Sequence, residues 1–398
     1  MASTQTRPEA AQNRVQPNSA PSNRASKNHA PLNRDRLNYE GQVILLLEGG
    51  GAIGAYQVGV YQALHEWGVE PDWIVGTSIG AINAALIVGN KREQRLDRLK
   101  DFWERLQQPA EWGQSLIPGS QTMASLMTIA NGISGFFEPN LLAMSNPQAI
   151  LGPEQAGFYS TEPLWNTLNE LVNVSLLQQA AEPRISLGAV NVSSGQMRYF
   201  DSDIEPIELA TVMASGALPP AFPAVRVNGQ AYWDGGVFSN TPFELVMNQE
   251  PRRNSLIFAA HLWHNEGPLP GSVWEAIGRS KEIQYASRVD NFVNAERKLH
   301  RLRHVISELG AQLPAATQSD PACRDLLGSG CDTTMHLCRL QAPRLVGEDA
   351  LRDIDFSAQG IEQRRQAGYS DTVSLLKTQP WAEPHDPIEG IVVHLAGG

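Results

Sequence analysis

The sequence lacks several features by which particular classes of protein are recognised. It contains three cysteines in 398 residues, Cys323, Cys331 and Cys338, and no C-x-x-C pair. So few cysteines, and an odd number of them, argue against a disulfide framework or a structural zinc site and favour a reducing compartment. No apolar run approaches the roughly 18 residues of a membrane span. Met1 is followed by no apolar stretch, so we expect no secretory signal peptide and a cytoplasmic protein.

Charged residues are also scarce, at 18% of the chain, and acidic residues outnumber basic ones by 42 to 31. The resulting net charge of -11 argues against nucleic-acid binding, which needs concentrated Lys and Arg. The nine histidines show no H-E-x-x-H motif or paired metal spacing, so we expect no metal and no cofactor. What the sequence does have is a 42% share of hydrophobic residues, enough for at least one large core.

The first 38 residues differ in composition from the rest. They are rich in Ala, Ser, Asn, Pro and Gln and lack aromatic residues, so they cannot bury enough surface to fold. We therefore expect a disordered tail over residues 1–40. Within the first 38 residues, the basic residues outnumber the two acidic ones, Glu9 and Asp35. A solvated tail and a tether to an anionic lipid surface both fit this charge.

From residue 42 onward, strands and helices alternate in the hydrophobic pattern. The continuous apolar run 43–47 indicates a strand buried on both faces, and helical spacing follows over residues 55–67. A second strand is expected at 73–75, followed by an apolar helix over 81–88. Strand, turn and helix occurring twice within about 50 residues predict an α/β fold with a mostly parallel sheet.

The pattern continues less regularly downstream. Strands are expected at residues 185–190, 197–200, 256–261 and 335–340. Helices are expected at 91–106, 207–215, 274–309 (long or broken) and 361–377. Residues 109–163 indicate an insertion over the sheet. We therefore expect a core domain over residues 41–263 and a mainly helical C-terminal extension over residues 264–398.

A G-x-S-x-G pentapeptide stands between the second strand and its helix: Gly76, Thr77, Ser78, Ile79 and Gly80. In this context the two glycines permit a sharp turn that exposes the serine oxygen at the carboxyl edge of the sheet, as in a nucleophile elbow. The N-terminus of the following helix directs unpaired N–H groups at that oxygen. A tight turn with Ser78 as an N-cap fits the same residues, but the strand–turn–helix context favours a nucleophile.

The glycine-rich loop 49–54 fits two kinds of site. G-x-G-x-x-G between a strand and a helix is typical of dinucleotide binding, and Asp72 follows at the distance of a ribose-binding acid. Such an acid should lie at the carboxyl end of the second strand, but Gly76 and Ser78 occupy that position. An oxyanion loop, whose N–H groups bind a tetrahedral intermediate, is therefore favoured. A nucleotide-binding oxidoreductase stays as the alternative.

A serine nucleophile needs a base, and the sequence offers two kinds. His261 and His264, near the end of a predicted strand, suit a histidine-based triad. Asp234 also ends an apolar segment and precedes Gly235 and Gly236, which permit close backbone approach. An Asp in a turn is usually structural, so these residues alone leave both alternatives open.

Taken together, the motifs at residues 49–54, 76–80 and 234–236 resemble the patatin-like phospholipase family. Residues 214–219 are similar to the A-S-x-A-x-P segment of that family. The resemblance implies a three-layer α/β/α fold and a Ser–Asp dyad, with Ser78 as nucleophile and Asp234 as proton acceptor. It also implies an acid turn at Gly235 and Gly236 and an oxyanion hole around Gly49, Gly50, Gly51, Ala52, Ile53 and Gly54.

The reaction that the resemblance implies is cleavage of a lipid or acyl ester through a covalent acyl-enzyme, with contact to a peripheral membrane surface left open. A non-catalytic patatin-like scaffold is a further alternative. Many family members have Arg or Lys where this chain has Ile53, which weakens the case for a phosphate-bearing substrate. Residues 355–357 and 364–369 resemble the extra region of a bacterial patatin-like subgroup.

Overall fold

The computed structural model describes residues 34–108, 128–179, 182–239, 242–346, 348 and 351–395. The expected N-terminal tail lies largely outside these residues, as does the first part of the expected insertion. The described chain begins with a short 3-10 helix, η1 (Arg34–Leu37), directly before the first strand.

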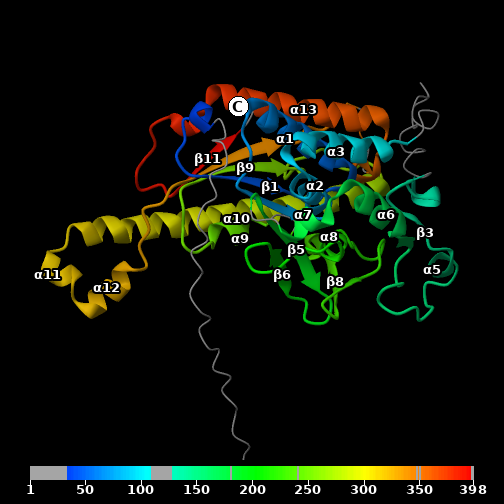
Figure 1. The fold of residues 1–398 in the computed structure, drawn as a ribbon, viewed down its shortest axis with the longest axis horizontal. Helices are drawn as coiled ribbons and strands as arrows, with labels where there is room; N and C mark the ends of the chain where they lie inside the picture. The colour runs from blue at the N-terminus through cyan, green and yellow to red at the C-terminus, as the bar shows by residue number, and fades with distance from the viewer. Residues whose placement is uncertain are drawn as a thin grey trace, which may run out of the picture. The chain divides into compact units, whose positions relative to one another are not determined.

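A nine-stranded sheet forms the centre of the fold (Figure 1). Its order is β11-β10-β9-β1-β2-β5-β8-β7, and β6 also pairs with β5. The ladders from β11 to β5 are parallel, whereas β6, β7 and β8 join by antiparallel pairing. The strands are β1 (Gln42–Leu47), β2 (Trp73–Thr77), β5 (Arg184–Asn191), β6 (Met197–Asp201), β7 (Val225–Val227), β8 (Gln230–Asp234), β9 (Ser255–His261), β10 (Met335–Gln341) and β11 (Ile391–Leu395).

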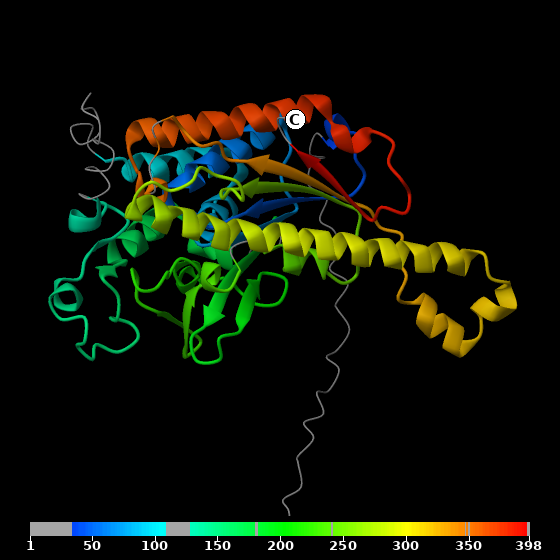
Figure 2. The ribbon, with the colours of Figure 1, turned by 180° about the vertical axis from the view of Figure 1, so that it is seen from behind.

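Helices cover both faces of this sheet, which is why its central strands are continuously apolar. Leu45 and Leu47 belong to one core cluster, and the alternate residues Ile44 and Leu46 belong to another. The first cluster includes residues of α1 (Ala55–Trp67), α2 (Ile79–Val88), α3 (Arg92–Arg105), α8 (Leu209–Ser215) and α13 (Ala358–Thr378). The second includes residues of α9 (Phe243–Met247) and α10 (Val273–Ala311). The predicted three-layer α/β/α fold is confirmed (Figure 2).

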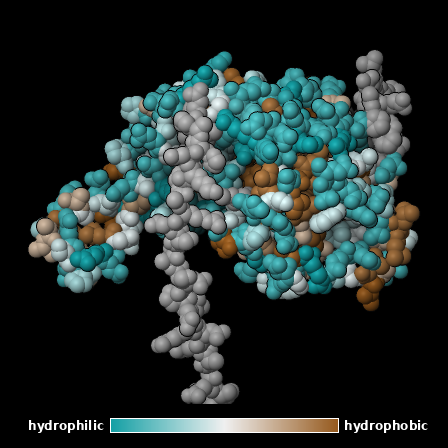
Figure 3. Space-filling view, viewed as in Figure 1, coloured by the Kyte–Doolittle hydropathy of each residue, from teal (hydrophilic) through white to brown (hydrophobic). Residues whose placement is uncertain are grey.

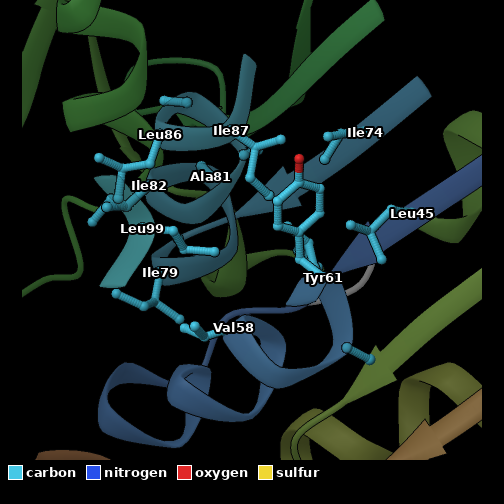
Figure 4. Packing of buried hydrophobic residues seen from close by; sticks show 14 of the residues in the cluster. Leu45, Val58, Tyr61, Ile74, Ile79, Ala81, Ile82, Leu86, Ile87 and Leu99 are labelled. Atoms are coloured by element: carbon cyan, nitrogen blue, oxygen red, sulfur yellow. The ribbon is translucent and has the colours of Figure 1, made fainter. Parts of the chain in front are cut away.

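Side chains of β1, β2 and the first helices interlock in the larger cluster. Figure 4 shows Leu45 and Ile74 from the sheet beside Tyr61 of α1, together with α2 and α3 residues that include Ile82, Leu86 and Leu99. The strand register then aligns the ends of the strands: Leu47 pairs with Gly76 on one side and with Ala260 on the other. The segments that follow β1, β2 and β9 therefore leave the sheet at one common edge.

The described part of the expected insertion is irregular. It contains a two-residue pairing of β3 (Glu138–Pro139) with β4 (Tyr159–Ser160) around α5 (Leu141–Ser145). Two helices that the hydrophobic pattern did not predict follow, α6 (Glu162–Leu171) and α7 (Val174–Gln178). A short 3-10 helix, η2 (Gly51–Gly54), lies between β1 and α1, and another, η4 (Gly235–Val237), follows β8.

The chain after β9 contributes both helices and strands. Its helix α10 is a single element of 39 residues, and β10 and β11 widen the parallel sheet. The shorter elements are α11 (Ala315–Gln318), α12 (Pro321–Leu327), η5 (Arg352–Ile354) and η6 (Pro380–Ala382). No helix within the described ranges combines the length and the apolarity needed to cross a membrane.

Candidate active site

Ser78 occupies the tip of a sharp turn between β2 and α2. Its backbone angles, φ 57° and ψ -127°, lie in a region that residues with a Cβ rarely adopt, and such strain is typical of functional sites. A Cβ at Gly80 would clash with the carbonyl oxygen of Leu47, so glycine at this position lets α2 start directly against the end of β1. Ser78 itself is half-buried, and its side chain lies at the carboxyl edge of the sheet.

Strand pairing brings Ser78 and Asp234 together. On β5, Gly188 pairs with Thr77 of β2, and the next residue, Ala189, pairs with Asp234 of β8. At Ala189 the strand β6 pairs with the other side of β5. The strands β2 and β8 must therefore lie end to end along the same side of β5. Ser78 follows the last residue of β2, and Asp234 is the last residue of β8, so the two residues meet where these strands end.

The end of α8 fixes both residues of this pair. The Ser215 hydroxyl accepts a hydrogen bond from the backbone N–H of Ser78 at 3.1 Å and donates one to the Gly188 carbonyl at 2.7 Å. Two residues later, the carbonyl of Ala217 accepts the backbone N–H of Asp234 at 2.9 Å. This segment can be recognised in the sequence only by its similarity to the A-S-x-A-x-P segment of the family. Hydrogen bonds between residues so far apart in the chain leave no local signal in the sequence.

Asp234 is a deeply buried carboxylate, with 1% of its surface exposed. Its Oδ1 accepts the Gly236 N–H at 2.7 Å, whereas its Oδ2 makes no hydrogen bond of normal geometry with the described residues. Burial raises the pKa of Asp234 to about 6, and the neighbouring Ser78 hydroxyl, the Gly236 N–H and the charge of Lys281 act against that rise. A carboxylate with a pKa near neutrality is a stronger base than an ordinary one.

The glycine-rich loop lies at the same edge, directly after β1. Gly51 has a φ of 54°, and a Cβ there would clash with the carbonyl oxygen of Asp353. The N–H of Ile53 donates to the Gly50 carbonyl at 3.2 Å. Among the described residues, no acceptor binds the N–H groups of Gly50, Gly51 or Ala52. This loop therefore presents up to three backbone donors beside the serine turn.

Polar side chains hold the glycine-rich loop in place. The indole N–H of Trp263 donates to the Gly49 carbonyl at 2.7 Å, and the amide of Gln57 donates to the Glu48 carbonyl at 2.7 Å. The amide of Asn83 reaches the carbonyl of Gly54 at 3.2 Å. Donors held by such fixed contacts need no reorganisation when charge develops in front of them.

Both histidines that the sequence offered as bases have partners other than Ser78. His261 lies 2.6 Å from a carboxylate oxygen of Glu48, and its ring stacks on Phe243 with centroids 5.6 Å apart. His264 donates from Nε2 to the carbonyl of Ala342 at 2.7 Å. In the described structure neither ring hydrogen-bonds to Ser78, so the geometry favours Asp234 over a histidine triad.

Asp72 lies at the opposite edge of the sheet from the glycine-rich loop. It directly precedes β2, and its carboxylate accepts the backbone N–H of Val43, near the start of β1, at 2.7 Å. A ribose-binding acid would have to lie at the carboxyl edge, so this position gives the dinucleotide alternative no support. No cluster of three or more potential metal ligands occurs in the part of the chain that the structure describes.

Two family models match this sequence, and both describe patatin phospholipases. A model described as patatin-like phospholipase matches residues 45–247, just over half of the chain. The chain belongs to the patatin-like phospholipase family. A second model, described as patatin phospholipase, matches residues 283–388 and so covers most of the C-terminal extension.

Known members of the family resemble the chain over parts of their length. A triacylglycerol lipase of Schizosaccharomyces pombe is 49% identical over 57 residues, which are 14% of this chain and 12% of the lipase. An NTE family protein of Mycobacterium bovis is 26% identical over 201 residues, 50% of this chain and 44% of that protein. The chain thus spans less than half the length of these relatives.

Among solved structures, VipD from Legionella pneumophila matches 86% of this chain and 67% of its own chain. The sequence identity is 16% and the TM-score is 0.39.

Proposed function

We propose that this patatin-like protein is a lipid acyl hydrolase that cleaves a carboxylic ester with Ser78 as nucleophile and Asp234 as base. The observation that carries the proposal is the meeting of the strained Ser78 turn with the buried Asp234 carboxylate on one edge of β5. Family membership supports the reaction class, and both residues stand in the positions of the family motifs that this chain resembles.

Acylation begins when Ser78 Oγ attacks the carbonyl carbon of the ester and Asp234 accepts the hydroxyl proton. The carbonyl π electrons move to its oxygen, which becomes the oxyanion of a tetrahedral intermediate. When the intermediate collapses, the bond to the alcohol breaks and protonated Asp234 returns its proton to the leaving oxygen. The acyl group stays on Ser78. In the second half, a water molecule attacks the acyl carbon while Asp234 accepts its proton. The bond between the acyl carbon and Ser78 Oγ then breaks, Asp234 returns the proton to Oγ, and the carboxylic acid leaves.

The proposed oxyanion hole uses the backbone donors of Gly50, Gly51 and Ala52, with the N-terminus of α2 adding its dipole. Ile53 contributes differently, because its N–H already binds the Gly50 carbonyl and its side chain is buried. It therefore fixes the loop rather than contacting the substrate. Backbone donors suit the reaction because they are strongest toward the charge that develops in the transition state.

Contact with a membrane surface belongs to the same proposal. Large apolar residues are exposed just before and at the start of α10: Leu269, Val273, Trp274 and Ile277. Three more are exposed in and after α5: Leu141, Leu142 and Ile150. Figure 3 shows hydrophobic residues gathered over the α5 region. Exposed apolar side chains near an ester-cleaving site favour entry of a lipid from a surface.

The dyad is tested by replacing each candidate base and measuring hydrolysis of a short-chain nitrophenyl ester. Asp234→Asn keeps the size of the side chain but removes the base, so kcat should fall about 100- to 10,000-fold. His261→Ala serves as the matched control from the adjacent strand end, and we expect less than about a tenfold loss of kcat. A loss in His261→Ala as large as that in Asp234→Asn would contradict the dyad and favour a triad.

A further inference from the structure

One face of α10 lines the dyad. Lys281, Tyr285 and Arg288 are spaced i, i+4 and i+7, so they share one side of this helix. The Arg288 guanidinium donates to the carbonyl of Phe238, just after the acid turn. The charges of Lys281 and Asp234 act on one another, and both act on Tyr285. A helix outside the stretch matched by the first family model therefore faces the catalytic pair.

Lys281 is held in place from several directions. Its ammonium forms an ion pair with the carboxylate of Asp353 in η5 and lies 5.6 Å from the centroid of the Trp263 ring. That tryptophan holds the carbonyl of Gly49, and the carbonyl of Asp353 lies against Gly51. The pair of Lys281 and Asp353 thus joins α10 to the segment that contacts the glycine-rich loop.

We propose that the C-terminal extension completes the active site, with Lys281 as a positioning residue that Asp353 holds beside Asp234 and the glycine-rich loop. This inference rests on the proposed hydrolase function. Lys281 lies between the two segments matched by the family models, and Asp353 lies within the second. The site is therefore built from both segments of the chain.

The expected consequence is electrostatic. Asp234 faces the Ser78 hydroxyl, the Gly236 N–H and, from α10, Lys281 and Tyr285. Burial works to lower the pKa of Lys281, but Asp353, Tyr285 and Asp234 together raise it above its ordinary value, so the ammonium stays charged. A nearby positive charge favours the carboxylate form of Asp234, which lowers its pKa against the effect of burial. Lys281 thereby keeps the base ionised at lower pH.

The test is the pH dependence of kcat/KM for ester hydrolysis. Because the base works as a carboxylate, the rate should fall as the pH drops through the Asp234 pKa of about 6. Lys281→Met removes the positive charge and should move this acid limb upward by about half a pH unit, less than the roughly 1 to 3 units of a contact pair. The rate at pH 6 should then fall more than the rate at pH 8.

Asp353→Asn supplies a second variant with the same sign. It removes the carboxylate that holds the Lys281 ammonium beside Asp234, so the acid limb should again move to higher pH, by no more than in Lys281→Met. Lys298→Met is the matched control, because Lys298 is an exposed lysine on the same helix. The acid limb of kcat/KM for this variant should stay at the wild-type pH. A residue with a merely structural role could lower the rate at every pH, but it would not shift the acid limb in both variants and leave it unmoved in the control.

Each result of this experiment either supports or overturns the proposed role of Lys281. Unmoved limbs in Lys281→Met and Asp353→Asn, with an active wild type, would overturn this inference and leave the proposed hydrolase intact. If thermal melting shows that Lys281→Met does not fold, the upward shift in Asp353→Asn is required on its own, and its absence overturns the inference. A folded wild type without ester hydrolysis would refute the proposed function itself, and this inference with it.

Discussion

Asp234 in the core region, from β1 to α9, and Arg364 in the C-terminal extension are two buried charges with opposite surroundings. In the core, Asp234 is buried with one carboxylate oxygen that has no hydrogen bond of normal geometry among the described residues. In the extension, Arg364 is fully buried but pairs with Glu348 at 2.8 Å and with Asp355 at 3.2 Å. An unpaired buried charge has a shifted pKa, whereas a paired one holds structure. The difference assigns Asp234 to the proposed chemistry of the site and Arg364 to the scaffold of the extension.

The two regions touch at Gly51, where the Asp353 carbonyl lies against the glycine-rich loop. Gly51→Val should displace this loop and lower kcat by about 100-fold or more, the usual cost of losing oxyanion donors, with little change in KM. Steady-state kinetics on the nitrophenyl ester measures both constants.

The control for this substitution is Gly152→Val, because Gly152 also has a positive φ but has open space around it. It reproduces the backbone strain without the contact, so its kcat should stay near that of the wild type. An increase in KM with unchanged kcat in Gly51→Val would show that the loop binds substrate rather than an oxyanion.

The scaffold role of the extension predicts a smaller effect, on stability. Arg364→Met removes the buried cation between the partly buried Glu348 and Asp355. Arg352, at 3.6 Å, still neutralises Glu348 in part, so the free energy of unfolding should fall by about 3 kcal/mol. The neighbouring Arg365→Met loses a partly exposed pair with Glu362 and a hydrogen bond to Gln62, and it should cost only about 1 kcal/mol. Urea unfolding of both variants compares these losses.

For the comparison of the two regions to hold, Arg364→Met must also leave the acid limb of kcat/KM at the wild-type pH while the protein is folded. A shifted limb would show that the charges of the extension reach the dyad through Arg364 as well, and the division between chemistry and scaffold would fail.

The sequence predicts the core well because its signals are local. The apolar run of β1 and the G-x-S-x-G turn around Ser78 each lie within a few residues, so the strand, the turn and the sheet class follow from them. The acid turn could be recognised by its residues, but its meeting with Ser78 depends on the register of β5. The hydrogen bonds of Ser215 and Ala217 to the dyad depend on that register as well.

The extension was harder to predict because its contacts are long-range. Lys281 belongs to a stretch with interleaved acidic and basic residues, where no charge stands out, and its partner Asp353 is 72 residues away. The strand β11 has only five residues and forms the edge of the sheet, so its hydrophobic pattern is weak. The sequence therefore predicts one strand of this mainly helical extension, at residues 335–340, and misses β11, whereas the structure adds both strands to the parallel sheet.

The central claim is that Ser78 is a nucleophile activated by Asp234, and covalent labelling tests it most directly. A fluorophosphonate probe reacts with activated serines, and peptide mass spectrometry locates the adduct. We expect one adduct on the peptide that contains Ser78, no labelling in Ser78→Ala, and much slower labelling in Asp234→Asn. An adduct on another residue, or undiminished labelling of Ser78→Ala, would contradict the account.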